Sequence, residues 1–308
     1  MIISSRVPPQ YAGITLIDYL ATRFTYLEKE QWDRRILEGR IKCNDKNARS
    51  DTPVAAGDII SYDMPAFTEP PADMSYTIIY EDNWLLGINK PGNLLVHHKG
   101  KSFRSNLIYH LRNVHDPAYP QAGVINRLDR ETSGLVLIAR DRETLRIMNR
   151  VVADRELEKE YHAIVHGIVD PPSGQINRAI GRVIDSKIRY KYGVDGEKAK
   201  DAFTRYETVI TVGNEYTLVR LLPETGRTHQ LRVHMASLGH VIVGDKLYGL
   251  SEDDFIDWRR NPAAWLGRLP FPRQALHCSS VRFIHPHTKK PCIIAAPLPE
   301  DIRTFLQF

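Results

Sequence analysis

Apolar residues near the start of the chain recur at helical spacing and predict two helices within a compact unit from about residue 15 to 62. The second helix should end at Gly39, because glycine is common just past a helix C-terminus. The stretches 40–44 and 56–60 then predict turns and short strands. The residues of the two apolar faces are Leu16, Tyr19 and Leu20 in the first helix and Trp32, Ile36 and Leu37 in the second.

The stretch 64–72 breaks this pattern. It contains Pro65, Pro70 and Pro71 and shows no apolar periodicity, which is typical of a linker. We therefore expect a small N-terminal domain at 1–63, a linker at 64–72 and a larger domain at 73–308.

The larger domain is rich in apolar and alternating runs that predict strands. The predicted strands are 76–80, 84–89, 135–139, 159–169, 202–212, 215–222 and a hairpin at 275–284 and 292–296. Helices are predicted at 105–112, after Asp141, after Thr228 and after Pro299, and the stretch 251–273 is expected to be an irregular loop. Asp141 and Thr228 are placed to cap their helices, so Arg227 should lie in a tight turn just before a helix N-terminus.

Composition places the chain among ordinary soluble globular proteins, with 42% hydrophobic and 26% charged residues. Lysine and arginine exceed aspartate and glutamate by 42 to 37, a modest excess that is compatible with a polyanionic partner. Three cysteines are too few for a disulfide framework, which favours a reducing compartment. No signal-like or membrane-spanning apolar run is present in the sequence, so we expect a cytoplasmic protein with no membrane association.

The most informative stretch for chemistry runs from Asn126 to Gly134. It places Asp129 between Arg127 and Arg130, directly before the apolar run 135–139. Since that run predicts a buried strand, the preceding loop should be held at a defined place on a sheet. Asp129 is then either reactive or merely paired with a neighbouring arginine, and the local pattern leaves both readings open.

Other catalytic classes find little support. His229, His234 and His240 lack the spacing of a helical zinc site, and we expect no metal. Ser133 is not in a Gly-x-Ser-x-Gly motif, and no dinucleotide or phosphate-loop motif is present in the sequence. We therefore expect no nucleotide cofactor.

A basic stretch follows the predicted strand 159–169. It carries Arg189 and Lys200 among other cations and is interleaved with Tyr190 and Tyr192. Charge mixed with aromatic rings suits contact with a nucleic-acid backbone, although such a stretch is as often a solvated loop.

Several ordered motifs together resemble the RluA-type family of RNA pseudouridine synthases, from about residue 76 to the C-terminus. The motifs that carry the resemblance are Asn126-Arg127-Leu128-Asp129-Arg130-Glu131-Thr132-Ser133-Gly134, Lys159-Glu160-Tyr161, Thr225-Gly226-Arg227-Thr228-His229-Gln230-Leu231-Arg232-Val233-His234 and Ala296-Pro297-Leu298-Pro299. Further matches are Lys90-Pro91-Gly92, the strand near Phe203 and the hairpin near His277.

The resemblance implies an α+β fold, with a mixed and largely antiparallel sheet flanked by helices. It also implies a catalytic aspartate at Asp129, a stacking tyrosine at Tyr161 and an arginine that pairs with the aspartate at Arg227. Arg127 and Arg130 are expected to contact RNA, with Arg189 and Lys200. This chain departs from the family at Asn126, where many members have histidine, and at Ala199, where glycine is frequent.

This chemistry agrees with what the residues can do. Conversion of uridine to pseudouridine breaks the C1′–N1 bond, turns the base and joins C1′ to C5. A guanidinium keeps a nearby carboxylate ionised, and a base flipped out of its stack can rest on a tyrosine ring. Whether the carboxylate attacks the base, attacks the sugar or removes a sugar proton stays open.

The N-terminal domain resembles the small S4-type RNA-binding domain, through 39–44 and Gly57-Asp58-Ile59. Arg34, Arg40 and Lys42 would then meet phosphates. The alternative is a helical module that only packs on its neighbour.

We thus expect a monomeric enzyme that isomerises uridines in structured RNA, either ribosomal RNA, of the large subunit, or transfer RNA. The rival interpretation is a non-catalytic RNA-binding or ribosome-assembly factor that retains the fold.

Overall fold

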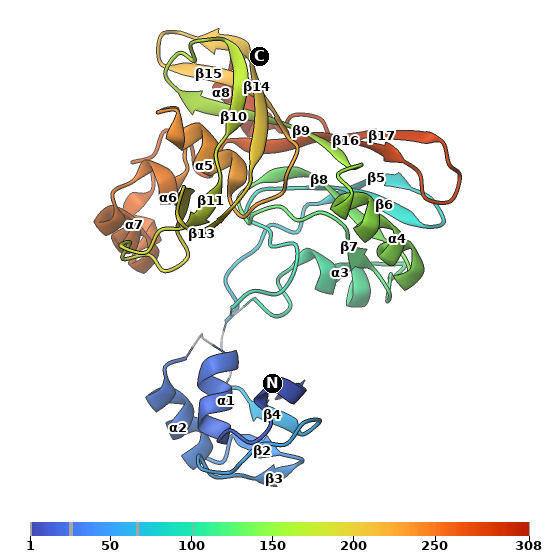
Figure 1. Ribbon diagram of the computed structural model, residues 1–308, viewed down its shortest axis with the longest axis vertical. Coiled ribbons are helices and arrows are strands. Elements are labelled where there is room, and N and C mark those ends of the chain that lie inside the picture. The colour runs from blue at the N-terminus through green and yellow to red at the C-terminus, as the bar shows by residue number, and fades with distance from the viewer. Residues whose placement is uncertain (1, 25–26, 66–67, 101, 308) are drawn as a thin grey trace. The chain divides into compact units, whose positions relative to one another are not determined.

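The computed structural model describes residues 2–24, 27–65, 68–100 and 102–307. The chain forms two compact units, Met1–Pro70 and Pro71–Phe308, and each is described by itself (Figure 1). The division falls inside the predicted linker. Met64, the first residue of that stretch, is nevertheless only 7% exposed, and residues 66–67 lie outside the described residues.

The smaller unit packs two helices with a four-stranded antiparallel sheet of order β1-β4-β2-β3. Its elements are β1 (Ile2–Arg6), a 3-10 turn at Pro9–Tyr11, α1 (Leu16–Arg23), α2 (Lys29–Leu37), β2 (Ile41–Cys43), β3 (Lys46–Asn47) and β4 (Ile59–Asp63). Leu16, Trp32 and Ile41 are almost completely buried. Leu37, by contrast, is 79% exposed, so its predicted place on the buried face of the second helix is wrong. It is the last residue of α2, where the helix leaves the core.

The larger unit is built on a sheet of ten strands. Eight of them follow the order β10-β14-β15-β9-β16-β8-β6-β5, with β17 beside β16 and β7 beside β8. Only the β16–β8 pair is parallel among the pairs that the described residues form in this sheet. The expected α+β fold with a mixed, largely antiparallel sheet is therefore confirmed. Its strands are β5 (Thr77–Glu81), β6 (Leu85–Lys90), β7 (Gly123–Val124), β8 (Ser133–Ala139), β9 (Glu158–His166), β10 (Ser173–Asn177), β14 (Phe203–Val212), β15 (Tyr216–Pro223), β16 (Leu276–Ile284) and β17 (Pro291–Ala295).

Helices lie on this sheet at separate places (Figure 1). α3 (Leu107–Asn113) and α4 (Arg142–Ala153) lie near β7 and β8, and α5 (Gln230–Ser237) contacts β15. Asp141 caps α4 as predicted, since its side chain accepts a hydrogen bond from the Thr144 amide. The remaining helices are α6 (Lys246–Gly249), α7 (Glu252–Arg260), a 3-10 turn at Pro262–Trp265 and α8 (Glu300–Phe305).

Two stretches are more regular than their sequences indicate. The stretch 251–273, expected to be an irregular loop, contains α7, which starts at a Ser251 cap and buries Phe255. The basic stretch forms a separate three-stranded sheet of β11 (Ile180–Arg182), β12 (Tyr192–Val194) and β13 (Glu197–Lys200), in the order β12-β11-β13. Helix α7 and the β11–β13 sheet are anchored by few apolar residues. These residues are too widely spaced to show a helical or alternating period in the sequence.

The start of helix α5 also differs from the prediction. Its N-cap is His229 and not Thr228, and His229 adopts the left-handed conformation with φ 57°. The amide of Arg227 instead donates to the side chain of Gln230.

Gly134 explains how β8 and β16 come close together just after the loop that carries Asp129. Its φ is +104°, and a Cβ there would lie 2.2 Å from the Cys278 carbonyl oxygen on β16. Only glycine permits this approach, because β8 and β16 would otherwise be forced apart.

Candidate active site

The loop that carries Asp129 is attached to the central sheet at both ends, because Asn126 hydrogen-bonds to β8 and the loop then continues into β8 itself. On its N-terminal side, the Asn126 amide nitrogen donates to the Leu135 carbonyl, and the Leu137 amide donates back to the Asn126 oxygen. Both bonds reach β8, so Asn126 acts as a backbone clamp. This gives Asn126 a structural role at the position where many members of the family that the chain resembles have histidine.

Lys90 also holds the loop that carries Asp129, through hydrogen bonds to backbone carbonyls. Its side chain is fully buried, and its Nζ donates to the carbonyls of Pro91, Leu94 and Arg130 at 2.8, 2.9 and 3.2 Å. Burial lowers the pKa of Lys90 to about 7. The contact with Arg130 joins the end of β6 to the residue that follows Asp129.

Asp129 is paired with Arg232. The Arg232 Nη1 donates to Asp129 Oδ2 at 2.7 Å, and the aspartate side chain keeps 37% of its surface exposed. Arg232 comes from α5, 103 residues further along the chain. The carboxylate is therefore ionically held and yet open to a substrate.

The predicted partner, Arg227, lies elsewhere. Its Nε donates to the Asp201 carbonyl at 2.9 Å, while Arg232 makes the pair with Asp129. The proposed Arg227–Asp129 pair is thus wrong. Both arginines belong to one motif, but the left-handed turn at His229 and the helix after it bring Arg232 inward.

The electrostatics favour an ionised Asp129. Burial opposes the charge, but Arg232 outweighs it and holds the pKa of Asp129 below its usual value. His229 lies beside the pair, with Nε2 at 3.9 Å from Asp129 Oδ2. Burial and the Arg232 charge lower the pKa of His229 to about 4, so this imidazole is neutral at pH 7.

Tyr161 lies on β9, opposite Cys278 of β16. It is 8% exposed, and burial, followed by the Cys278 and Asp129 charges, raises its pKa well above the usual range. Tyr161 is therefore a neutral phenol close enough to Asp129 to feel its charge. Such a ring offers an apolar face and no charge of its own.

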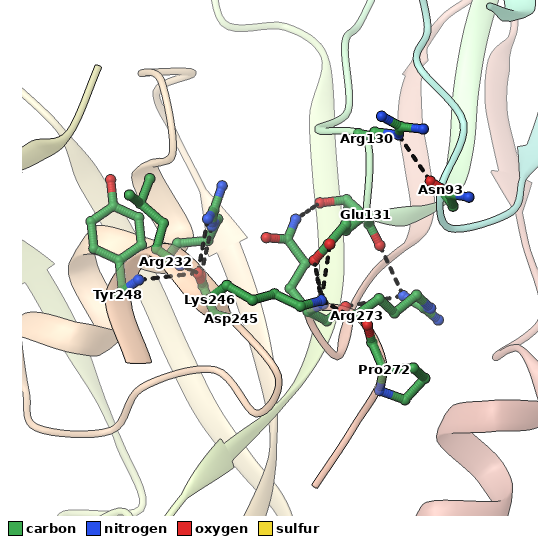
Figure 2. Close-up of polar contacts among 12 residues, drawn as sticks. Asn93, Arg130, Glu131, Arg232, Asp245, Lys246, Tyr248, Pro272 and Arg273 are labelled. Atoms are coloured by element: carbon green, nitrogen blue, oxygen red, sulfur yellow. Dashed lines mark hydrogen bonds and ion pairs between the residues drawn. The ribbon is translucent and has the colours of Figure 1, made fainter. Parts of the chain in front are cut away.

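Arg232 itself is held from behind by Asp245. Figure 2 shows the two side chains together, with Lys246 extending from the next position toward Glu131. Arg232 is 9% exposed and Asp245 3%. A charged pair this well buried requires the good geometry that is observed.

The predicted RNA-binding residues divide into two groups. Arg130 is committed to the protein, since it donates to Asn93 and to the Pro71 carbonyl. Arg40 pairs with Glu38 at 3.0 Å. The other predicted RNA-binding residues are exposed, and they are Arg34, Lys42, Arg127, Arg189 and Lys200.

Sequence reasoning missed Arg232, Asp245, Lys246 and Lys90. Arg232 stands between Leu231 and Val233 on a helix whose residues 230–235 are all buried, a burial that the structure shows and the sequence alone does not. A cation in such a helix needs an anionic partner.

The described residues contain no group of three metal-binding side chains and no helix long and apolar enough to cross a membrane.

Residues 85–237 match the family model described as RNA pseudouridylate synthase. An uncharacterized RNA pseudouridine synthase of Chlorobaculum parvum is 34% identical over 94% of this chain and 92% of its own length. The ribosomal large subunit pseudouridine synthase D of Xylella fastidiosa is 33% identical over 96% of this chain and 89% of its own.

A solved structure agrees. Human RNA pseudouridylate synthase domain containing 1 is 25% identical, with a TM-score of 0.57, and the match covers 75% of this chain and 86% of that chain.

Proposed function

Because this chain belongs to the RluA family of RNA pseudouridine synthases, we propose that Asp129 is its catalytic carboxylate and that its substrate is large-subunit ribosomal RNA. The observation that carries the first part is the 2.7 Å pair between Asp129 and Arg232. It holds a partly exposed carboxylate in its ionised form at a loop fastened to the sheet.

The reaction needs few groups. The C1′–N1 bond of a uridine breaks, the base turns, the C1′–C5 bond forms, C5 loses its hydrogen and N1 gains one. An ionised Asp129 facing the flipped nucleotide can start this sequence at C1′ or C6. No electron is transferred and no group is donated.

The neighbours of Asp129 suit these roles. Arg232 orients the carboxylate and keeps it charged. The Tyr161 ring stays neutral and can support the displaced base by stacking. His229, neutral and 3.9 Å away, adds no competing charge to the pocket.

The substrate part of the proposal rests on the relatives named as ribosomal large subunit synthases, which match nearly the whole chain. It keeps the large-subunit ribosomal RNA of the sequence-based expectation and leaves out transfer RNA. We place the enzyme in the cytoplasm, in keeping with its three free cysteines. A non-catalytic assembly factor would have no use for a carboxylate held in this way.

Incubation of the enzyme with protein-free large-subunit ribosomal RNA and with transfer RNA tests the proposal. New pseudouridines are mapped by carbodiimide modification and reverse transcription, with Asp129→Asn as the blank. We expect discrete positions in the ribosomal RNA only. Modification of transfer RNA alone would overturn the substrate, and equal activity of the Asp129→Asn blank would overturn the catalytic residue.

A further inference from the structure

Helix α6 begins at a buried carboxylate that reaches the catalytic centre. Asp245 caps the helix, accepting from the amides of Leu247 and Tyr248 at 3.0 and 3.2 Å. The same carboxylate accepts from Arg232 Nε at 2.6 Å and Nη2 at 2.8 Å. Asp245 thereby joins the local backbone to the arginine that holds Asp129.

The two-point contact determines the direction of the third bond. A guanidinium is planar, so fixing Nε and Nη2 against one carboxylate fixes where Nη1 points. In this structure Nη1 points at Asp129 Oδ2, at 2.7 Å. Without Asp245, Arg232 would still carry its charge but would lose its fixed plane.

The next residue reaches the other side of the catalytic loop. Lys246 is 4% exposed, and its Nζ lies 2.9 Å from each carboxylate oxygen of Glu131, two positions after Asp129 (Figure 2). The same ammonium donates to the Pro272 carbonyl at 2.7 Å. Lys246 thus ties the C-terminal end of the Asp129 loop to the segment that leads into β16.

A third side chain of this helix turns toward His229. The Tyr248 hydroxyl lies 3.0 Å from His229 Nδ1, and its ring packs against the Arg232 guanidinium at 5.1 Å. One helical turn therefore contacts three groups around Asp129, namely Arg232, Glu131 and His229.

The base of this turn is rigid. The Val243 amide donates to the Ile164 carbonyl on β9, the strand that carries Tyr161. Gly244 follows with φ +75°, and a Cβ there would lie 2.0 Å from the Arg273 carbonyl oxygen. The segment is packed too tightly to shift without disturbing the central sheet.

We propose that Asp245 and Lys246 are positioning residues, which aim Asp129 at the substrate by fixing Arg232 on one side and Glu131 on the other. The inference rests on the proposed role of Asp129. Neither residue needs to touch RNA. Their loss should therefore lower the rate of the chemical step and leave RNA affinity largely unchanged.

A double-mutant cycle on single-turnover rates at saturating RNA tests Asp245. Asp245→Asn should lower the rate by about 10²-fold, the effect expected of a misplaced catalytic group, with RNA affinity within about three-fold of wild type. Because Asp245 acts through Arg232, adding Asp245→Asn to Arg232→Lys should cost little more than Arg232→Lys alone. A purely structural role would instead give losses that multiply.

The matched control is Asp82→Asn. Asp82 also accepts from two amides a short way along the chain, those of Trp84 and Leu85, and from the buried His285. It has no contact with the Asp129 loop among those described. Asp82→Asn should keep the wild-type rate at a temperature where circular dichroism shows both variants folded. Equal rates for Asp82→Asn and Asp245→Asn would overturn the proposal for Asp245.

Lys246 gives an independent arm, which also serves if Asp245→Asn does not fold. Lys246→Met should slow the chemical step, and Lys246→Arg should recover part of it, because a guanidinium can still pair with Glu131. Loss of affinity with an intact rate at saturation would overturn the positioning role. If Asp129→Asn itself kept turnover, the proposed function would fall first, whereas an inactive Asp129→Asn with normal Asp245→Asn and Lys246→Met rates would overturn this inference alone.

Discussion

The charges around Asp129 and the charges on β11–β13 come from the same residue types but have opposite surroundings. Arg232 is 9% exposed and makes three ionic hydrogen bonds. Lys198, on β13, has a side chain that is 88% exposed and lies 3.9 Å from its nearest carboxylate. A buried charge without a partner is too costly to persist, while an exposed pair is worth little. The side chains around Asp129 are therefore held in one fixed arrangement. The exposed cations of β11–β13 are free to adjust to the phosphates of an RNA backbone.

The largest effect should come from Asp129 itself. Asp129→Asn keeps the shape of the side chain and removes its charge, so we expect at least about a 10³-fold loss in single-turnover rate. Affinity for RNA should hold or rise slightly, since a negative charge is gone from the binding surface. Release of tritium from 5-tritiated uridine in the RNA measures the rate, because C5 loses its hydrogen in the reaction. A rate within ten-fold of wild type would contradict the assignment.

Lys90 is a second buried charge, and its effect can be measured as the pH dependence of the free energy of unfolding. Its pKa is about 7 in the folded chain against 10.5 for an ordinary lysine, so the unfolded state binds more protons between those values. Stability should therefore rise as the pH increases from about 7 toward 10, by a contribution on the order of a few kcal/mol. Lys90→Met should lack this contribution. Urea unfolding of both proteins at pH 7 and pH 9 measures the difference, and parallel pH dependences would contradict it.

The sequence could single out Asp129 and Tyr161 as site candidates because each stands in a short motif, tied to a strand, that carries the family resemblance. It could not choose between Arg227 and Arg232, which share one motif. The choice depends on the left-handed backbone at His229 and on the phase of α5 after it, a helix that packs against β12, α6 and β15. Lys246 was missed because its partner Glu131 lies 115 residues away in the chain, and Asp245 because its pairing with Arg232 depends on how α5 and α6 pack together. The sheet was predictable from long apolar runs, and α7 was not, because only Phe255 of its residues is buried.

The smaller unit tests the exposed side of the comparison. Its candidate contacts are few, since Arg40 is paired with Glu38 while Arg34 and Lys42 are exposed. Deleting residues 1–70 should leave the catalytic unit folded and its saturated rate intact, but weaken RNA affinity. The slope of log affinity against log salt should become shallower by roughly one to two ionic contacts, each worth about 0.9 on a duplex. Filter binding across a salt series measures this. Superimposable slopes would show that the unit does not hold RNA.

The smallest effect is expected from single exposed cations. Arg189→Ala or Lys200→Ala should each weaken RNA affinity only a few-fold and reduce the salt slope by about 1 or less. The rate at saturating RNA should not change, because neither residue contacts the Asp129 loop among the contacts described. The same filter-binding series measures both variants, and Glu197→Gln on β13, the strand of Lys200, is a matched control that removes a negative charge. A large loss of the rate at saturating RNA in either alanine variant would contradict the division between the side chains around Asp129 and the exposed cations of the β11–β13 region.

The most direct test compares two conservative substitutions within one motif, Arg232→Lys and Arg227→Lys, by single-turnover tritium release at saturating RNA. Arg232 makes the pair with Asp129 and a two-point contact with Asp245, which an ammonium cannot reproduce. Arg227 donates to a backbone carbonyl, which an ammonium can also do. We expect Arg232→Lys to lose about 10²-fold in rate and Arg227→Lys to stay within about three-fold of wild type. The opposite order, with Arg227→Lys slow and Arg232→Lys near wild type, would contradict the account.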